Sequence, residues 1–279
     1  MKNMSRNVKR ILIGIVILAA VLLLSAALLV RPSNHRVWTA GQEQLPNAIF
    51  DGARVTIHNV RNFPWGPDEA GTAVWEDRTY DLDRIASAWF VLAPFSRDNR
   101  GPAHTFLSFG FADSQYVAIS IEARREAGED YSLLRGMLRR FEIMYVIGDE
   151  RDLIGLRTSN RGDDVYVYPI RASQEKIRAL FVEMLQRANA LHERPEFYNT
   201  LTNNCTTNIL EHANRITPNR IPYGKEVLLP GYADELAQRL GLIDTELALA
   251  DARARFLVNE RARTFADDPL FSVRIREPD

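Results

Sequence analysis

Cysteine is the residue type that this chain of 279 residues has least of, since only Cys205 occurs. A single cysteine excludes any internal disulfide, so the fold must be stabilised by its apolar core even in an oxidising compartment. The sequence predicts no cofactor and no bound metal. The acidic turn 149–152 has no Cys or His near it and alternates with arginines, which indicates a solvated ion-pair turn.

A strong charge excess is also missing. The 35 Lys and Arg residues nearly balance the 36 Asp and Glu residues, which gives a formal net charge of −1. No basic block occurs, so the sequence argues against a nucleic-acid partner. No internal repeat, low-complexity tract or Gly/Ser linker divides the chain, and we predict one domain after the N-terminal segment.

One long apolar run is present, at residues 11–30, and it follows a basic segment, residues 1–10. Twenty helical residues at about 1.5 Å each span about 30 Å, the thickness of the hydrocarbon layer. We predict a transmembrane helix at 11–30 with a cytoplasmic tail at 1–10. Residues 31–52 are predicted to be a juxtamembrane linker, and residues 53–279 to form the domain on the far side of the membrane.

A cleaved signal peptide is the alternative for this segment. The apolar region of a signal peptide is usually about 7–15 residues long, which is shorter than this run. The small residues Ser25, Ala26 and Ala27 keep cleavage open as an alternative.

Alternating apolar residues predict strands at 54–60, 75–80, 86–92, 141–147 and 165–170, and Ser173 predicts the N-cap of an amphipathic helix. Segments 104–111 and 116–124 alternate on both sides of a short turn, which is typical of a β-hairpin. Pairing their apolar rows fixes the register and makes His104 and Glu122 neighbours. A carboxylate beside an imidazole suits a general base, but a histidine next to an acid is also common on a solvated sheet face.

Cys205 lies among small polar residues, 203–208, where a loop is predicted to become a helix. Unsatisfied N–H groups and the helix dipole favour a thiolate at such a position. The alternative is a small buried side chain without chemistry. His212 lies two helical turns further on and is predicted to be too far away to act as its base.

Four motifs resemble the Lnb N-terminal periplasmic domain family: 104–111, 120–126, 148–158 and 195–208. The resemblance covers about residues 50–276. It implies an α+β, circularly permuted papain-like (NlpC/P60-like) fold, with an antiparallel sheet and packed helices and with the histidine strand before the cysteine helix. It also implies an association with bacterial lipoprotein N-acyl transfer.

The family's nucleophile and base correspond to Cys205 and His104, and the register argument adds Glu122 as the orienting group. The expected chemistry is acyl transfer or thioester hydrolysis on a membrane lipid or lipoprotein, with Asn204 or Tyr198 as candidate oxyanion donors. A partner membrane protein is an open expectation, because the resembled transferase carries further membrane helices. A cell-wall peptidase or amidase and a non-enzymatic envelope protein are the other interpretations.

Overall fold

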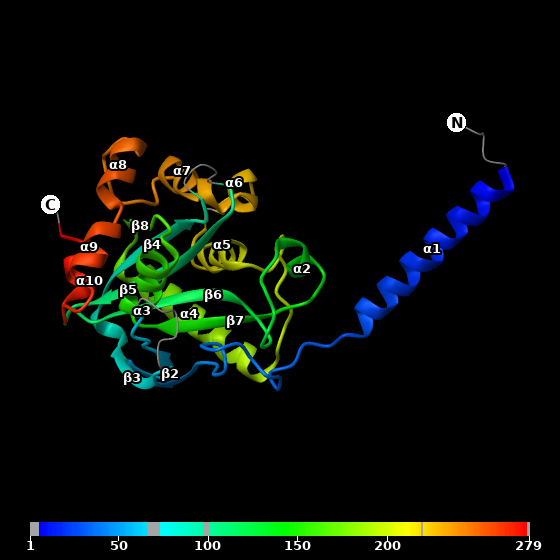
Figure 1. Ribbon diagram of the computed structural model, residues 1–279. Helices are drawn as coiled ribbons and strands as arrows, with labels where there is room; N and C mark the ends of the chain where they lie inside the picture. Colours follow the sequence, from blue (N-terminus) through cyan, green and yellow to red (C-terminus); the bar gives the residue numbers. More distant parts are fainter. Residues whose placement is uncertain (1–5, 66–72, 97–100, 219, 278–279) are drawn as a thin grey trace.

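The computed structural model describes residues 6–65, 73–96, 101–218 and 220–277 (Figure 1). They form a mixed α+β domain around an eight-stranded, mostly antiparallel sheet with the strand order β1-β2-β7-β6-β5-β4-β8, and β3 pairs with β2. The strands are β1 (Asn47–Asp51), β2 (Arg54–Arg61), β3 (Trp75–Asp81), β4 (Ile85–Pro94), β5 (Ala103–Phe111), β6 (Tyr116–Arg124), β7 (Glu142–Gly148) and β8 (Tyr166–Pro169).

The β5–β6 hairpin has the register that its apolar rows predict. Leu107 pairs with Ile119 and Phe109 with Val117, so both rows lie on the same face of the sheet. A shift by one residue would turn either row away from the core. The hairpin prediction is confirmed, and β5 is buried along its whole length at the centre of the sheet.

Helices cover both faces of the sheet. On one face, α4 (Gln174–Glu193) and α5 (Cys205–Ile216) pack against the row that contains Leu107 and Phe109. On the other face, α3 (Glu150–Gly155), α9 (Asn259–Thr264) and α10 (Phe271–Arg274) contribute to a second core around Phe106. The remaining helices are α2 (Leu133–Met137), α6 (Lys225–Leu228), α7 (Ala233–Arg239) and α8 (Leu249–Phe256).

Helix α1 (Arg6–Leu29) projects from the body of the molecule (Figure 1). Within the part of the chain that the structure describes, no helix combines the length and apolar character needed to cross a membrane. The transmembrane helix predicted at residues 11–30 therefore has no support from the structure. Residues 1–5 of the predicted cytoplasmic tail lie outside the described residues.

The segment predicted to be a juxtamembrane linker, residues 31–52, belongs instead to the folded domain. Its last residues form β1, which pairs with β2 from Asn47 to Asp51. Upstream, the Trp38 ring lies 4.0 Å from the buried Arg124 guanidinium, which also donates hydrogen bonds to the carbonyl oxygens of Gln42 and Glu43. A buried cation requires such partners, and this segment supplies them.

Candidate functional site

Cys205 is the first residue of α5, and its side chain is buried. Asn204 is the N-cap: its Oδ1 accepts a hydrogen bond from the Thr207 amide at 2.9 Å, while Thr207 Oγ1 accepts one from the Asn204 amide at 2.8 Å. This capping box fixes where the helix starts and therefore where the thiol lies. Helix α5 thus begins at Cys205, where the sequence predicts that a loop becomes a helix, and the neighbouring polar residues form its cap.

His104 lies near the start of β5, with Ser120 and Glu122 on the adjacent strand β6. Its Nε2 is 2.7 Å from Ser120 Oγ and 3.2 Å from Glu122 Oε1. Ser120 Oγ donates to Glu122 Oε1 at 2.7 Å. Because the serine proton points to the carboxylate, Nε2 must carry the proton that it shares with Ser120. Nδ1 is then the ring nitrogen that remains to accept a proton.

The imidazole of His104 and the thiol of Cys205 line the same cavity and act on each other's pKa. Burial alone would raise the pKa of Cys205, but the charge and the hydrogen bond of His104 outweigh it and lower that pKa to about 7. Burial and Arg157 lower the pKa of His104, whereas Glu122 and Cys205 raise it, and the net direction is upward. The two shifts together favour a thiolate next to an imidazolium.

The carboxylate of Glu122 has further partners that the sequence did not reveal. Burial opposes its charge, but His104, Arg157 and Ser120 outweigh burial and hold its pKa well below the usual range. Arg157, which comes from the π-helical turn Leu156–Arg161, places Nη2 3.3 Å from Glu122 Oε1. π-Helical turns are frequent at functional sites, but nothing in the sequence marks this one. The motif 148–158 contains Arg157 without indicating its role.

The two candidate oxyanion donors differ in their freedom to donate. Both polar atoms of the Asn204 side chain have hydrogen-bond partners. Nδ2 donates to the Thr200 carbonyl oxygen at 2.6 Å, and Oδ1 accepts from the Thr207 amide at the helix cap. The Tyr198 hydroxyl lies 3.3 Å from the Tyr131 hydroxyl and lines the same cavity as Cys205. The Tyr198 hydroxyl therefore shares a hydrogen bond with Tyr131, while the Asn204 side chain is held by the loop and the helix cap.

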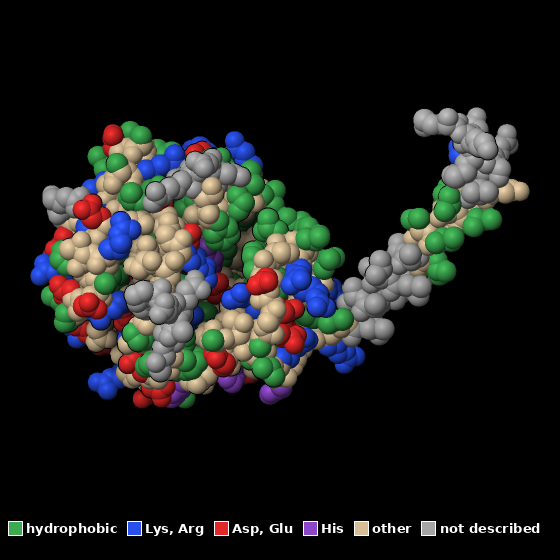
Figure 2. All heavy atoms as spheres, viewed as in Figure 1, with side chains coloured by type: hydrophobic (Ala, Val, Ile, Leu, Met, Phe, Trp, Pro, Cys, Tyr) green, Lys and Arg blue, Asp and Glu red, His purple; other side chains and the backbone are tan. Residues whose placement is uncertain are grey.

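A cavity of about 530 Å³ reaches these residues, and its wall includes His104, Glu122 and Cys205. Figure 2 shows hydrophobic side chains over α2 and α6 on either side of a hollow in this face. Residues from both helices, among them Leu133 and Leu228, line the cavity. The thiol and the imidazole thus lie at an apolar cleft that is large enough for an extended chain.

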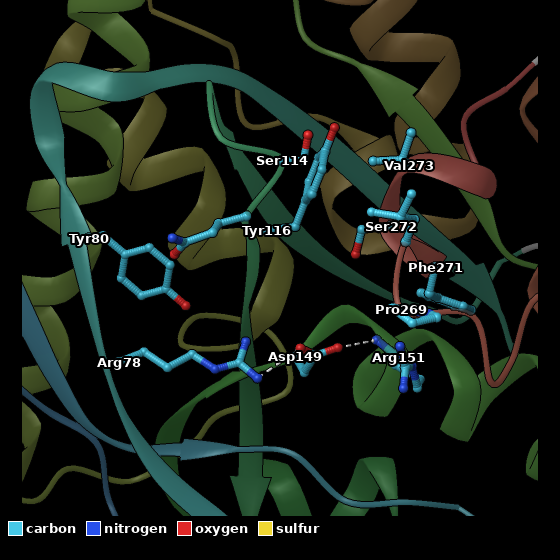
Figure 3. A pocket seen from close by; sticks show the side chains of 12 residues that line it. Arg78, Tyr80, Ser114, Tyr116, Asp149, Arg151, Pro269, Phe271, Ser272 and Val273 are labelled. Atoms are coloured by element: carbon cyan, nitrogen blue, oxygen red, sulfur yellow. Dashed lines mark hydrogen bonds and ion pairs between the residues drawn. The ribbon is translucent and has the colours of Figure 1, made fainter.

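A second cavity, of about 290 Å³, lies beside the acidic turn 149–152 (Figure 3). There Asp149 Oδ2 is 2.9 Å from Arg78 Nη2, and its Oδ1 accepts a hydrogen bond from the Arg151 amide. Glu150 and Asp152 are fully buried and pair with Arg276 and Arg61. The prediction of a solvated turn is wrong, because these arginines come from distant parts of the chain. No group of residues suited to a metal ion occurs among the described residues.

His212 takes part in a separate buried network. Its Nε2 lies 2.5 Å from the Tyr145 hydroxyl, and its Nδ1 faces Glu183. The Tyr145 hydroxyl also donates to Asn208 Oδ1. His212 therefore supports the interior side of α5 rather than the cleft.

These observations define the class of the protein: a mixed α+β domain with a cysteine and a histidine in the wall of one apolar cleft. The chain belongs to the Lnb N-terminal periplasmic domain family, whose model matches residues 71–229. That range contains His104, Glu122 and Cys205, and membership indicates a periplasmic location. The comparison with curated proteins found no match, and neither did the comparison with solved structures.

Proposed function

We propose that this protein is a thiol-dependent acyltransferase or thioesterase of the bacterial envelope that acts on lipid or lipoprotein acyl groups. The observation that carries the proposal is that His104 and Cys205 line the same apolar cleft and that His104 lowers the pKa of the thiol. A thiol with a pKa near 7 beside an imidazole is a nucleophile and its base. The strand with the histidine precedes the helix with the cysteine, which suits a circularly permuted papain-like fold.

In the proposed reaction, Nδ1 of His104 takes the thiol proton and the Cys205 sulfur attacks the carbonyl carbon of an ester. The bond between that carbon and the ester oxygen breaks, and the leaving alcohol receives the proton from His104. The acyl group remains on sulfur as a thioester. An amine or water then attacks the thioester and restores the thiol.

Two groups suit the negative charge that develops on the carbonyl oxygen. Backbone N–H groups in the first turn of α5 have no partner within the helix and lie next to Cys205. The hydroxyl of Tyr198 is the side-chain donor on the same cavity wall. Glu122 and Ser120 hold the imidazole with Nδ1 toward the sulfur, so they are positioning residues.

The substrate class is inferred from the surface around the thiol. Apolar side chains dominate the mouth of the cleft, which suits an acyl chain better than a polar muropeptide. The apolar residues of α1, such as Ile11 and Val16, are exposed. We propose that residues 11–30 anchor the domain in the inner membrane, with residues 1–10 cytoplasmic and the domain periplasmic, close to a lipid-linked donor.

The test is the intact mass of the full-length protein after incubation with phospholipid, a diacylated lipopeptide or an activated ester. An added acyl mass on Cys205 is expected, and Cys205→Ala and His104→Ala should each abolish it. The exposed His192→Ala is the matched histidine control and should acylate normally. Full acyl transfer by Cys205→Ala would rule out the proposal.

Two other outcomes point to the remaining interpretations. Cleavage of muropeptides without acylation by any ester would indicate a cell-wall peptidase that uses the same pair of residues. Alkylation of Cys205 by iodoacetamide no faster than that of a free thiol would indicate a non-enzymatic envelope protein.

A further inference from the structure

Exposed apolar side chains gather at the mouth of the cleft. Seven large hydrophobic residues line the cavity and are also more than a third exposed: Phe95, Tyr131, Leu133, Met137, Leu201, Leu228 and Leu229. Leu134 and Leu138 extend this set outward along α2, with 62% and 58% of their surfaces exposed. Soluble surfaces rarely leave so many large apolar side chains together, and such a patch marks an interaction site.

Positive charge accompanies this apolar rim. Arg135, Arg139 and Arg140 are exposed within and directly after α2, while Glu129 and Asp130 precede it. Among the charged residues that line the cavity, Arg125, Arg157 and Arg161 outnumber Glu122, the one carboxylate. Leucines interleaved with arginines are typical of segments that lie in the headgroup region of an anionic membrane.

We propose that this rim, defined as residues 131–140 of the α2 segment together with Leu201, Leu228 and Leu229, docks on an anionic lipid bilayer. Leu134 and Leu138 enter the boundary between headgroups and acyl chains, and the three arginines of the α2 segment contact lipid phosphates. The mouth of the cleft then opens onto the bilayer, so that an acyl group reaches Cys205 without crossing water. The choice of a lipid surface rests on the proposed function.

The test measures contact with lipid rather than activity. In full-length protein with Cys205→Ser, a fluorescent label on Leu134→Cys reports on the rim. The same label on Leu270→Cys reports on an exposed leucine at the N-cap of α10, and α10 lies on the other side of the domain from α2 (Figure 1). Both proteins are reconstituted in phosphatidylglycerol vesicles that contain a nitroxide lipid. The label at position 134 is expected to be quenched at least about twofold more strongly than that at position 270.

Equal quenching at the two positions overturns the proposal, and a protein partner would then be the occupant of the rim. Because both proteins lack the reactive thiol, this result is independent of whether Cys205 accepts an acyl group. Failure of the docking and failure of the proposed chemistry are therefore distinguishable.

A second arm tests the charge. Replacing phosphatidylglycerol by phosphatidylcholine is expected to reduce quenching at position 134. In a protein that also carries Arg135→Gln, Arg139→Gln and Arg140→Gln, quenching should no longer depend on the lipid charge. A preference for phosphatidylglycerol that persists in this variant contradicts the role of the three arginines.

Discussion

The two nitrogens of the His104 ring have different partners, and this difference organises the site. Nε2 is occupied by Ser120 and Glu122, which leaves Nδ1 as the ring nitrogen that can accept a proton. Arg157 approaches the same carboxylate, so Glu122 is shared between one cation and one imidazole. The charge of the imidazole, and with it the charge of the thiol, therefore depends on Glu122.

Glu122→Gln is expected to make the thiol less acidic. Loss of the carboxylate lowers the pKa of His104, so less imidazolium is present to stabilise the thiolate, and the pKa of Cys205 rises from about 7. The pH midpoint of the rate of iodoacetamide alkylation should move upward by about one unit. The exposed Glu175→Gln on α4 is the control and should leave the midpoint unchanged. An unchanged midpoint in Glu122→Gln would show that the carboxylate does not act on the pair.

The first turn of helix α5 both caps the helix and positions Cys205 at the cleft. The Asn204 cap satisfies the Thr207 amide, and its Nδ2 holds the preceding loop at Thr200. The same turn presents Cys205 to the cleft. A change in the cap should therefore affect stability and reactivity together.

Asn204→Ala is expected to lower the free energy of unfolding by about 1 kcal/mol, because a helix N-cap is lost. It should also slow alkylation of Cys205. Ser173→Ala removes the cap of α4, where Ser173 Oγ accepts a hydrogen bond from the Lys176 amide. This control should cost similar stability, measured by urea unfolding, and leave the alkylation rate unchanged. Equal alkylation rates in the two variants would show that the Asn204 cap does not affect the reactivity of Cys205.

Across the whole molecule, buried ion pairs join the C-terminal helices to the sheet. Glu150 is fully buried at the start of α3, and both of its oxygens pair with Arg276, 126 residues away. The Arg276 guanidinium also lies over the rings of Trp89 and Tyr116 at 4.4 and 4.2 Å. This contact holds the end of the chain against β4 and β6.

Arg276→Met is expected to destabilise the protein by about 3–5 kcal/mol, because it leaves the Glu150 carboxylate buried without a counter-charge. Adding Glu150→Gln should restore most of this loss, since the methionine keeps part of the apolar contact with the rings. Urea unfolding of both variants measures the difference. A loss well below about 1 kcal/mol in the single variant would mean that water reaches the carboxylate.

Elements that depend on neighbouring residues could be predicted from the sequence, whereas contacts between residues remote in the chain could not. The β5–β6 hairpin and the start of α5 follow from local patterns, namely a period of two and a polar cap, and the structure contains both. The sequence predicts a linker at residues 31–52 because the packing of this segment depends on the buried Arg124, whose burial no local pattern reveals. The prediction of a solvated turn at 149–152 is wrong for the same reason, since the arginines that pair with it are remote in the chain.

For the site, the sequence by itself determined the placement of Cys205 at a helix start and of His104 beside Glu122, because capping and strand register are short-range. Only the tertiary structure decided that Cys205 and His104 line the same cavity, since about a hundred residues separate them in the chain. It also decided that Ser120 and Arg157 complete the environment of Glu122, and that apolar side chains from α2 and α6 border one cleft. Packing of remote elements produces these contacts, and packing leaves no periodic signal in the chain.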